Sequence, residues 1–221
     1  MKELYKTLIV EDHVSTAQGI ACFLNKICNS TGTKFNTQVA CNLGDALIAL
    51  KTKPSFDLVF LDIRLEPQPE IGLKSGEDLG IEIRKLYPGT LIIVSTFHDE
   101  PFYIGNIFKN VKPEGFFVKG DLDNKGFIGG IISVLDETPY LSKTVVKCLS
   151  DNLNNDIKID IRDRQLLFEI EKGLTMEKVA ENLFYSRSTV TKMKKKLKIT
   201  FGVEGGSDKD LLDKAREMGF I

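Results

Sequence analysis

The residues best suited to chemistry stand directly after short apolar runs. In chain order they are Glu11, Asp12, Asp62, Thr96 and Lys119. Three carboxylates in one pocket repel one another unless a cation neutralises them, and Mg²⁺ prefers carboxylate oxygens. A lysine beside them could hold a phosphoryl oxygen, and a threonine hydroxyl could donate to another. The set therefore predicts that Asp62 is a nucleophile toward phosphorus, with Mg²⁺ and Lys119 stabilising the charge.

Each of these residues also has an ordinary structural explanation. Glu11 or Asp12 could cap a helix, because acids at strand ends often do so. Lys119 could be a solvated surface lysine, and Thr96 a turn residue. The functional interpretation depends on all of them standing at the strand ends that one site requires.

The apolar runs alternate with helical patterns, which predicts an α/β domain with a parallel sheet buried on both faces. The expected strands are 7–10, 58–61, 91–95 and 116–118, with a weaker one near 36–40. The expected helices are 15–26, 42–50, 76–86, 101–110 and 125–135. Since ligands bind at the carboxyl ends of such strands, the chemical residues should meet at one edge.

The segments LIVEDH, LVFLDIRL, IIVSTFHDE and GFFVKGD resemble those of response-regulator receiver domains. The resemblance covers roughly residues 5–138. It implies a flavodoxin-like (βα)5 fold with a parallel five-stranded sheet. The segment between Asp62 and Gly76 departs from the family, because it is about six residues longer than usual.

The same resemblance implies a role for each site residue. Asp62 would accept a phosphoryl group from a sensor histidine kinase, and Thr96 and Lys119 would bind its oxygens. Phe116 matches the family's switch aromatic, although on its pattern alone it would be a core residue. The implied Mg²⁺ ligands are Glu11, Asp12, Asp62 and the backbone carbonyl of Arg64.

Charge differs between the two halves of the chain. Residues 1–150 contain 16 basic and 18 acidic residues, whereas residues 159–221 contain 13 and 11. Arg187 to Lys198 holds six basic residues and no acid. Only the second half therefore has an electrostatic footprint suited to nucleic acid.

The second half has a purely helical pattern. The expected helices are 162–172, 175–183, a third capped by Ser186 and running to about 199, and 207–217. On the third helix, Val190, Met193 and Leu197 recur at core spacing, which leaves Ser188, Lys192 and Lys195 on the opposite face. One buried stripe backed by a cationic face suits a helix that lies in a DNA major groove. The alternative is an ordinary helix with a solvated lysine face.

The segment GLTMEKVAENLFYSRSTVTKMKKKLK resembles the LuxR-type output domain, a four-helix unit with a helix-turn-helix. The resemblance implies that Thr191, Lys192 and Lys195 contact bases or the groove. It implies phosphate contacts from Arg187, Ser188, Thr189 and Lys196. The last helix would supply a dimer interface.

These features predict a phosphorylation-dependent transcriptional regulator that binds double-stranded DNA as a homodimer. The expected domains are a receiver at 1–138, a connecting segment and linker at 139–158, and a helix-turn-helix domain at 159–221. The polar stretch SDNLNND (150–156) is the expected linker.

Composition restricts the alternatives. No apolar run reaches the roughly 18 residues that cross a bilayer, and the N-terminus does not resemble a signal peptide. Four single cysteines indicate neither a disulfide framework nor a zinc site, so a cytoplasmic protein is expected. We expect no multiple-turnover enzyme; an aspartate-dependent phosphatase and a purely protein-binding third helix are the rival interpretations.

Overall fold

The computed structural model describes residues 1–52, 55–97, 101–153, 159–218 and 220–221. The chain divides into two compact units, residues 1–99 with 107–146 and residues 100–106 with 147–221. Within the described ranges, no helix is both long enough and apolar enough to cross a bilayer.

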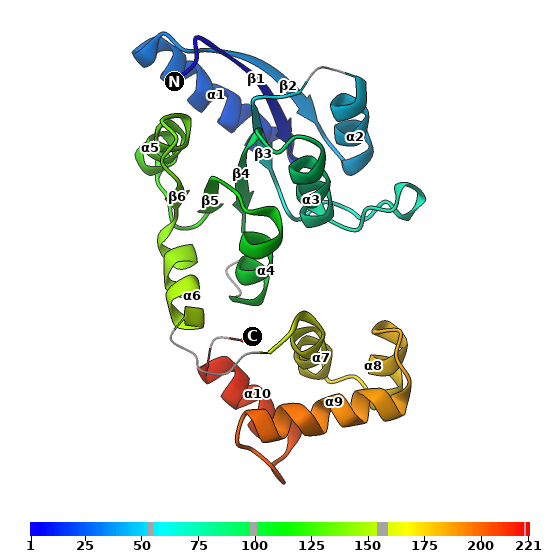
Figure 1. The fold of residues 1–221 in the computed structure, drawn as a ribbon. Coiled ribbons are helices and arrows are strands. Elements are labelled where there is room, and N and C mark those ends of the chain that lie inside the picture. The colour runs from blue at the N-terminus through cyan, green and yellow to red at the C-terminus, as the bar shows by residue number, and fades with distance from the viewer. Residues whose placement is uncertain (53–54, 98–100, 154–158, 219) are drawn as a thin grey trace. The chain divides into compact units, whose positions relative to one another are not determined.

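A single parallel sheet forms the centre of the first unit (Figure 1). Its strands are β1 (Leu4–Val10), β2 (Lys34–Ala40), β3 (Leu58–Leu61), β4 (Leu91–Thr96), β5 (Gly115–Val118) and β6 (Tyr140–Leu141). They lie in the order β2-β1-β3-β4-β5-β6, and every neighbouring pair is parallel. The first five strands have the flavodoxin-like order, so the predicted fold class is confirmed.

The predicted number of strands was wrong, because the described residues form six strands rather than five. Tyr140 donates its N–H to the carbonyl of Glu114 at 2.9 Å, and Ser142 donates to that of Phe116 at 2.9 Å. Without β6, the edge strand β5 would have a row of unpaired backbone N–H and C=O groups. The start of the connecting segment pairs with these groups. Two residues carry no alternation, which is why the sequence did not predict this strand.

Helices cover both faces of the sheet. The helices up to residue 153 are α1 (Val14–Thr31), α2 (Leu43–Thr52), α3 (Gly76–Leu86), α4 (Pro101–Val111), α5 (Asn124–Leu135) and, after β6, α6 (Lys143–Leu153). Figure 1 shows α1 and α5 on one side of the sheet and α2 and α3 on the other. All four residues of β3 and of β5 are buried, as expected of strands covered on both faces.

The long segment after Asp62 folds back on itself before α3 begins. Gln68 and Leu73 form an antiparallel bridge around a short 3₁₀ helix, η1 (Pro69–Ile71). Figure 1 shows this segment projecting beside α3. Ser75 then caps α3, with its hydroxyl accepting from Asp78 N–H. The extra residues therefore form a projecting loop between β3 and α3.

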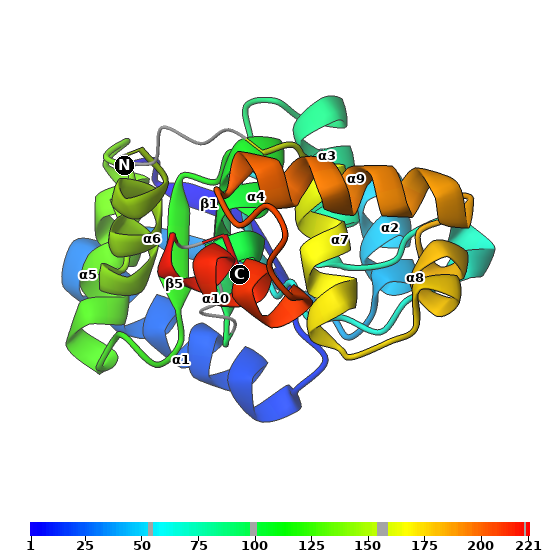
Figure 2. The same ribbon diagram turned by 90° about the horizontal axis from the view of Figure 1, so that it is seen from below.

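Within the second unit, residues 159–221 form the helices α7 (Ile161–Glu171), α8 (Met176–Asn182), α9 (Arg187–Thr200) and α10 (Asp208–Glu217). Ser186 caps α9, Ser207 caps α10 with a capping box, and Gly173 ends α7 with φ +69°. Val190 and Leu197 are buried in the core of the unit, and Met193 packs against that core. Figure 2 shows α9 lying across α7.

The predicted connecting segment, residues 139–158, contains more regular structure than expected. It supplies β6 and α6, and α6 continues into the polar stretch that was predicted to be the linker. Residues 154–158, the rest of that prediction, lie outside the described residues.

Gly76 should be essential for the close packing of α3 against the end of β3. A Cβ there would collide with the carbonyl oxygen of Asp62 and lie 2.8 Å from Cα of Ile63. Because neither backbone group can move cheaply, Gly76→Ala should lower the free energy of unfolding by about 2 kcal/mol or more. Urea denaturation followed by circular dichroism measures this loss.

Gly19→Ala is the matched control. Gly19 lies inside α1, and a Cβ there would meet nothing within 4 Å. Alanine should therefore stabilise the helix by roughly 0.5–1 kcal/mol. An equal response of the two variants would contradict the packing argument.

Candidate functional site

The ends of β1, β3, β4 and β5 bring the predicted chemical residues to one edge of the sheet. Backbone hydrogen bonds continue just past the strands and hold these ends in line. The N–H of Asp62 donates to the carbonyl of Val10 at 2.9 Å, and the N–H of Lys119 donates to the carbonyl of Thr96 at 2.7 Å. The acids and the lysine are therefore positioned by the sheet itself.

Lys119 lies between two buried carboxylates. Its Nζ is 2.8 Å from Oδ2 of Asp62 and 2.9 Å from Oε2 of Glu11. Glu11 is 1% exposed and Asp62 5% exposed. Three charged groups are thus withdrawn from water at one point, which is costly unless each has a partner.

The pKa values of Glu11 and Lys119 reflect this burial. Burial raises the pKa of Glu11; the hydrogen bond from Lys119 opposes the rise, and the neighbouring Asp62 carboxylate adds to it. Burial alone would lower the pKa of Lys119, but hydrogen bonds and attraction from Asp62 and Glu11 outweigh it and raise the pKa. Lys119 therefore stays cationic at neutral pH.

The donor set fits a hard divalent cation. Oε1 of Glu11 is buried and accepts no hydrogen bond from any residue that the structure describes, although the His13 ring nitrogen Nδ1 lies 3.5 Å away. Ligand atoms of Glu11, Asp12 and His13 lie within 4.8 Å of one another. The N–H of Arg64 donates to Oδ1 of Asp62 at 2.9 Å, so the Arg64 backbone also borders the site. A buried oxygen without a partner beside other carboxylates is what a bound Mg²⁺ would satisfy.

Thr96 and Phe116 occupy buried positions near the site. Thr96, the last residue of β4, pairs in register with Val118, and Phe116 pairs with Val94. Both side chains are fully buried. Phe116 is therefore a core residue in this structure, and its predicted switching role stays a prediction.

Phe97 was not predicted to belong to the site. Its ring centroid lies 4.9 Å from Nζ of Lys119, although the side chain is 68% exposed. The ring thus adds a cation–π contact to an ammonium already held by two carboxylates. An aromatic residue directly after Thr96 was the available signal, but nothing local distinguishes such a contact from an exposed loop residue.

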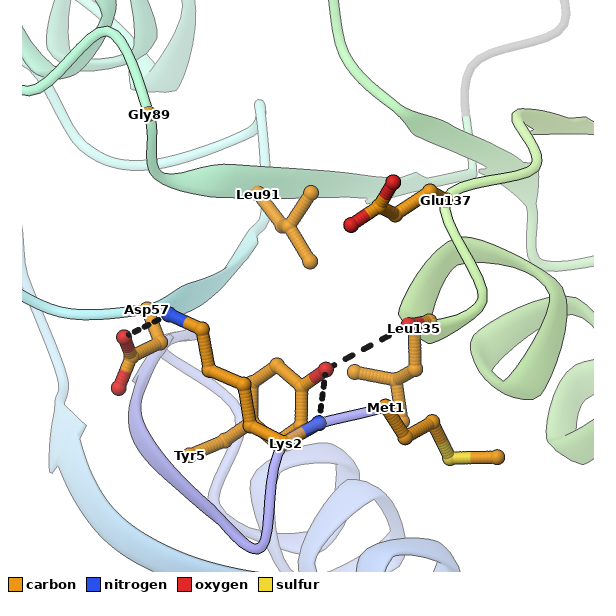
Figure 3. Close-up of a pocket in the computed structure, with 8 residues that line it drawn as sticks. All are labelled: Met1, Lys2, Tyr5, Asp57, Gly89, Leu91, Leu135 and Glu137. Carbon is orange, nitrogen blue, oxygen red and sulfur yellow. Dashed lines mark hydrogen bonds and ion pairs between the residues drawn. The ribbon is translucent and has the colours of Figure 1, made fainter.

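A pocket of about 270 Å³ lies near the amino ends of β1 and β4, away from the acidic site (Figure 3). Lys2 and Asp57 at its rim pair with each other at 2.8 Å, and the Tyr5 hydroxyl donates to the carbonyl of Leu135 at 3.4 Å. Lys2, Asp57 and the Tyr5 hydroxyl are thus engaged within the protein, and we assign the pocket no role in the chemistry.

The exposed face of α9 carries the residues predicted to contact DNA. Lys192 and Lys195 are exposed and form no ion pair with any residue in the described part of the chain. Thr191 is also exposed, with its hydroxyl donating to the carbonyl of Arg187 at 2.9 Å. Two lysines one helical turn apart therefore form a free cationic face.

The remaining predicted contacts already have partners inside the second unit. Arg187 pairs with Glu177 at 3.0 Å, and Lys196 pairs with the buried carboxylate of Asp163 at 3.0 Å. The hydroxyls of Ser188 and Thr189 lie 2.9 and 2.8 Å from the capping hydroxyl of Ser186. These contacts join α9 to α7 and α8 and to its own capping residue.

Replacing Lys119 with methionine should destabilise the protein in a pH-dependent way. At pH 7 two buried carboxylates lose their counter-charge, which should cost about 3 kcal/mol of unfolding free energy. A raised pKa means that Glu11 stabilises the fold most below its ordinary value of 4.5, and this contribution is lost as pH rises through the folded-state pKa. Losing Lys119 raises that pKa further, so the variant's deficit should shrink at pH 5.

Urea denaturation at pH 5 and pH 7 measures the difference. Lys51→Met, which removes an exposed lysine at the end of α2, is the control and should show little loss at either pH. A Lys119→Met deficit of the same size at both pH values would argue against this account.

The lysines of α9 should separate into two classes by stability. Lys196→Ala leaves the buried Asp163 carboxylate without its ammonium partner and should lower the melting temperature. Lys195→Ala, one residue earlier and without such a partner, should change stability by less than about 0.5 kcal/mol. Thermal unfolding of the two variants checks this, and equal melting temperatures would refute the assignment.

Comparison with known proteins identifies the fold. No protein-family model and no curated protein sequence matches the chain. RcsB from Salmonella enterica serovar Typhimurium, solved bound to a promoter with phosphomimetic BeF₃⁻, is 20% identical over 95% of this chain and 97% of that one, with a TM-score of 0.64.

Two further solved structures agree. A complex of the two-component response regulator RcsB with DNA is 20% identical, covering 96% of this chain and 98% of that one, with a TM-score of 0.61. The response regulator ChrA of a heme-sensing two-component system is 17% identical over the full length of both chains, with a TM-score of 0.50. The chain therefore has the fold of these response regulators.

Proposed function

We propose that this protein is a response regulator of a two-component system, in which Asp62 accepts a phosphoryl group from a sensor histidine kinase. In this proposal the second unit binds double-stranded DNA and regulates transcription, in the cytoplasm. The observation that carries it is the contact of Asp62 with Lys119 at 2.8 Å, beside a buried Glu11 oxygen that accepts no hydrogen bond from the described residues.

The local contacts support Asp62 as the nucleophile. Lys119 and the Arg64 N–H each hold one of its carboxylate oxygens. One oxygen forms a bond to phosphorus while the P–N bond to the kinase histidine breaks, and the histidine leaves with that electron pair and takes a proton from solvent. Lys119, cationic and within reach, neutralises charge on a phosphoryl oxygen, and Thr96 is proposed to bind another.

Glu11, Asp12, Asp62 and the backbone carbonyl of Arg64 are proposed to hold Mg²⁺. When bound, the ion would neutralise negative charge on the carboxylates and on the transferring phosphoryl oxygens. The Glu11 oxygen that accepts no hydrogen bond within the described part of the chain supports this assignment, because burying a carboxylate oxygen without a hydrogen-bond donor costs stability.

The DNA contacts are proposed from the outer face of α9. Thr191, Lys192 and Lys195 are assigned to base edges or the groove. Phosphate contacts are assigned to Arg187, Ser188, Thr189 and Lys196, of which Arg187 and Lys196 would have to share their ion-pair partners with DNA. Phosphorylation would favour a homodimer, since a two-fold pair reads two half-sites and pairing two weak modules raises affinity.

The test is DNA binding with and without the phosphoryl mimic. Wild-type protein with Mg²⁺ and beryllofluoride should bind a two-half-site duplex, selected from a randomised library, at least about tenfold more tightly than without them. Asp62→Asn keeps the shape but not the nucleophile, so it should bind equally with and without the mimic. Fluorescence anisotropy measures the affinities.

A variant with alanine at both Lys192 and Lys195 is compared in the same DNA-binding experiment. Removing two phosphate or base contacts should weaken binding in both states and reduce its salt dependence. If wild-type protein binds DNA but ignores the mimic, the phosphorylation switch is wrong. If it binds no duplex in either state, the third helix serves a protein partner and the DNA-binding proposal is wrong.

A further inference from the structure

Phe184 stands out in the turn between α8 and α9. Its side chain is 90% exposed, and its backbone has φ +56°. Its N–H donates to the carbonyl of Glu181 at 3.1 Å, so the backbone of the turn is well defined. The ring, however, gains almost nothing from burial.

The fold of the turn does not explain an aromatic side chain here. The left-handed region is unfavourable for residues with a Cβ and more so for bulky ones, while glycine and asparagine adopt it readily. Among the described residues, the other non-glycine positions with positive φ are Lys112 and Glu137, which are both polar. Phe184 therefore combines a strained backbone with a fully solvated apolar ring.

The surroundings indicate what the ring contacts. Ser186 caps α9 two residues later, and the stretch from Arg187 to Lys198 carries six basic residues and no acid. Phe184 thus lies three residues before α9, on which Lys192 and Lys195 form the cationic face that is proposed to meet DNA. This charge favours a nucleic-acid occupant over a protein surface.

We propose that Phe184 is a DNA-contact residue whose ring packs against deoxyribose of the strand at the edge of the groove that α9 enters. The inference rests on the proposed DNA-binding function and adds an apolar contact to its cationic ones. Because deoxyribose is the same at every position, the contact contributes affinity without sequence preference. The strain in the turn is then the cost of presenting the ring outward.

Phe184→Asn tests this proposal, because the variant should be more stable than the wild-type protein and yet bind DNA more weakly. Asparagine relieves the left-handed strain, so the melting temperature should rise by about 4 °C. Affinity for the selected duplex and for an unrelated duplex should fall about tenfold to a similar degree. The slope of log affinity against log salt should stay unchanged, since no phosphate contact is lost.

Two matched variants complete the experiment. Phe184→Tyr keeps an aromatic face and should retain most of the affinity, whereas Lys192→Ala should reduce the salt slope. Unchanged affinity in Phe184→Asn would overturn the proposal. So would a lower melting temperature, which would mean that the ring stabilises the fold. If wild-type protein binds no duplex, the DNA-binding function itself fails, and this inference with it.

Discussion

Burial of two carboxylates around one ammonium group is the constraint on which the first unit depends. Glu11 and Asp62 lose most of their hydration, and Lys119 returns only part of it through two short hydrogen bonds. Such a group must be held rigidly, because an ion pair in low dielectric is favourable only with good geometry. The sheet supplies that rigidity by placing all three residues directly after adjacent or nearby strands. One buried oxygen of Glu11 accepts no hydrogen bond from the residues that the structure describes, and a cation could neutralise it.

In the second unit, the lysines of α9 differ in whether they have an ion-pair partner. Lys194 and Lys198 both lie 3.0 Å from carboxylate oxygens of Asp208, so they tie α9 to the start of α10. Lys192 and Lys195, in the same basic run, point to solvent. A run of lysines that looks uniform in sequence is therefore divided by the fold into residues that hold the helix and residues that remain for a partner. Lys192 and Lys195 could therefore bind a partner without breaking an ion pair that joins α9 to another helix.

Local signals predicted most of the elements, and non-local contacts account for what was missed. β3 and α3 were predicted with the observed bounds, because an apolar run and a capped amphipathic pattern are written in consecutive residues. Tyr140–Leu141 becomes a strand only because β5 offers a free edge. The contact of Phe97 with Lys119 joins positions that are separated by a helix and a strand, so no spacing rule could predict it. The roles assigned to the site residues stay predictions, and those of Arg64 and Phe116 rest on the resemblance alone.

The sixth strand also determines how the site connects to the rest of the chain. Asp121, two residues after Lys119, accepts hydrogen bonds of 2.7 Å from both the N–H and the hydroxyl of Thr144 in the first turn of α6. Burial would raise the pKa of Asp121, but hydrogen bonds from Ser142 and Thr144 outweigh it and lower the pKa, so the carboxylate remains a strong acceptor. The carbonyl of Phe116 accepts from Ser142 in the same segment. Because β5 and the loop after it are bonded to this segment at several points, a displacement of Lys119 or Phe116 must either strain these bonds or move the start of α6. The hydrogen bonds that link the acidic site to the start of α6 therefore lie within the first unit.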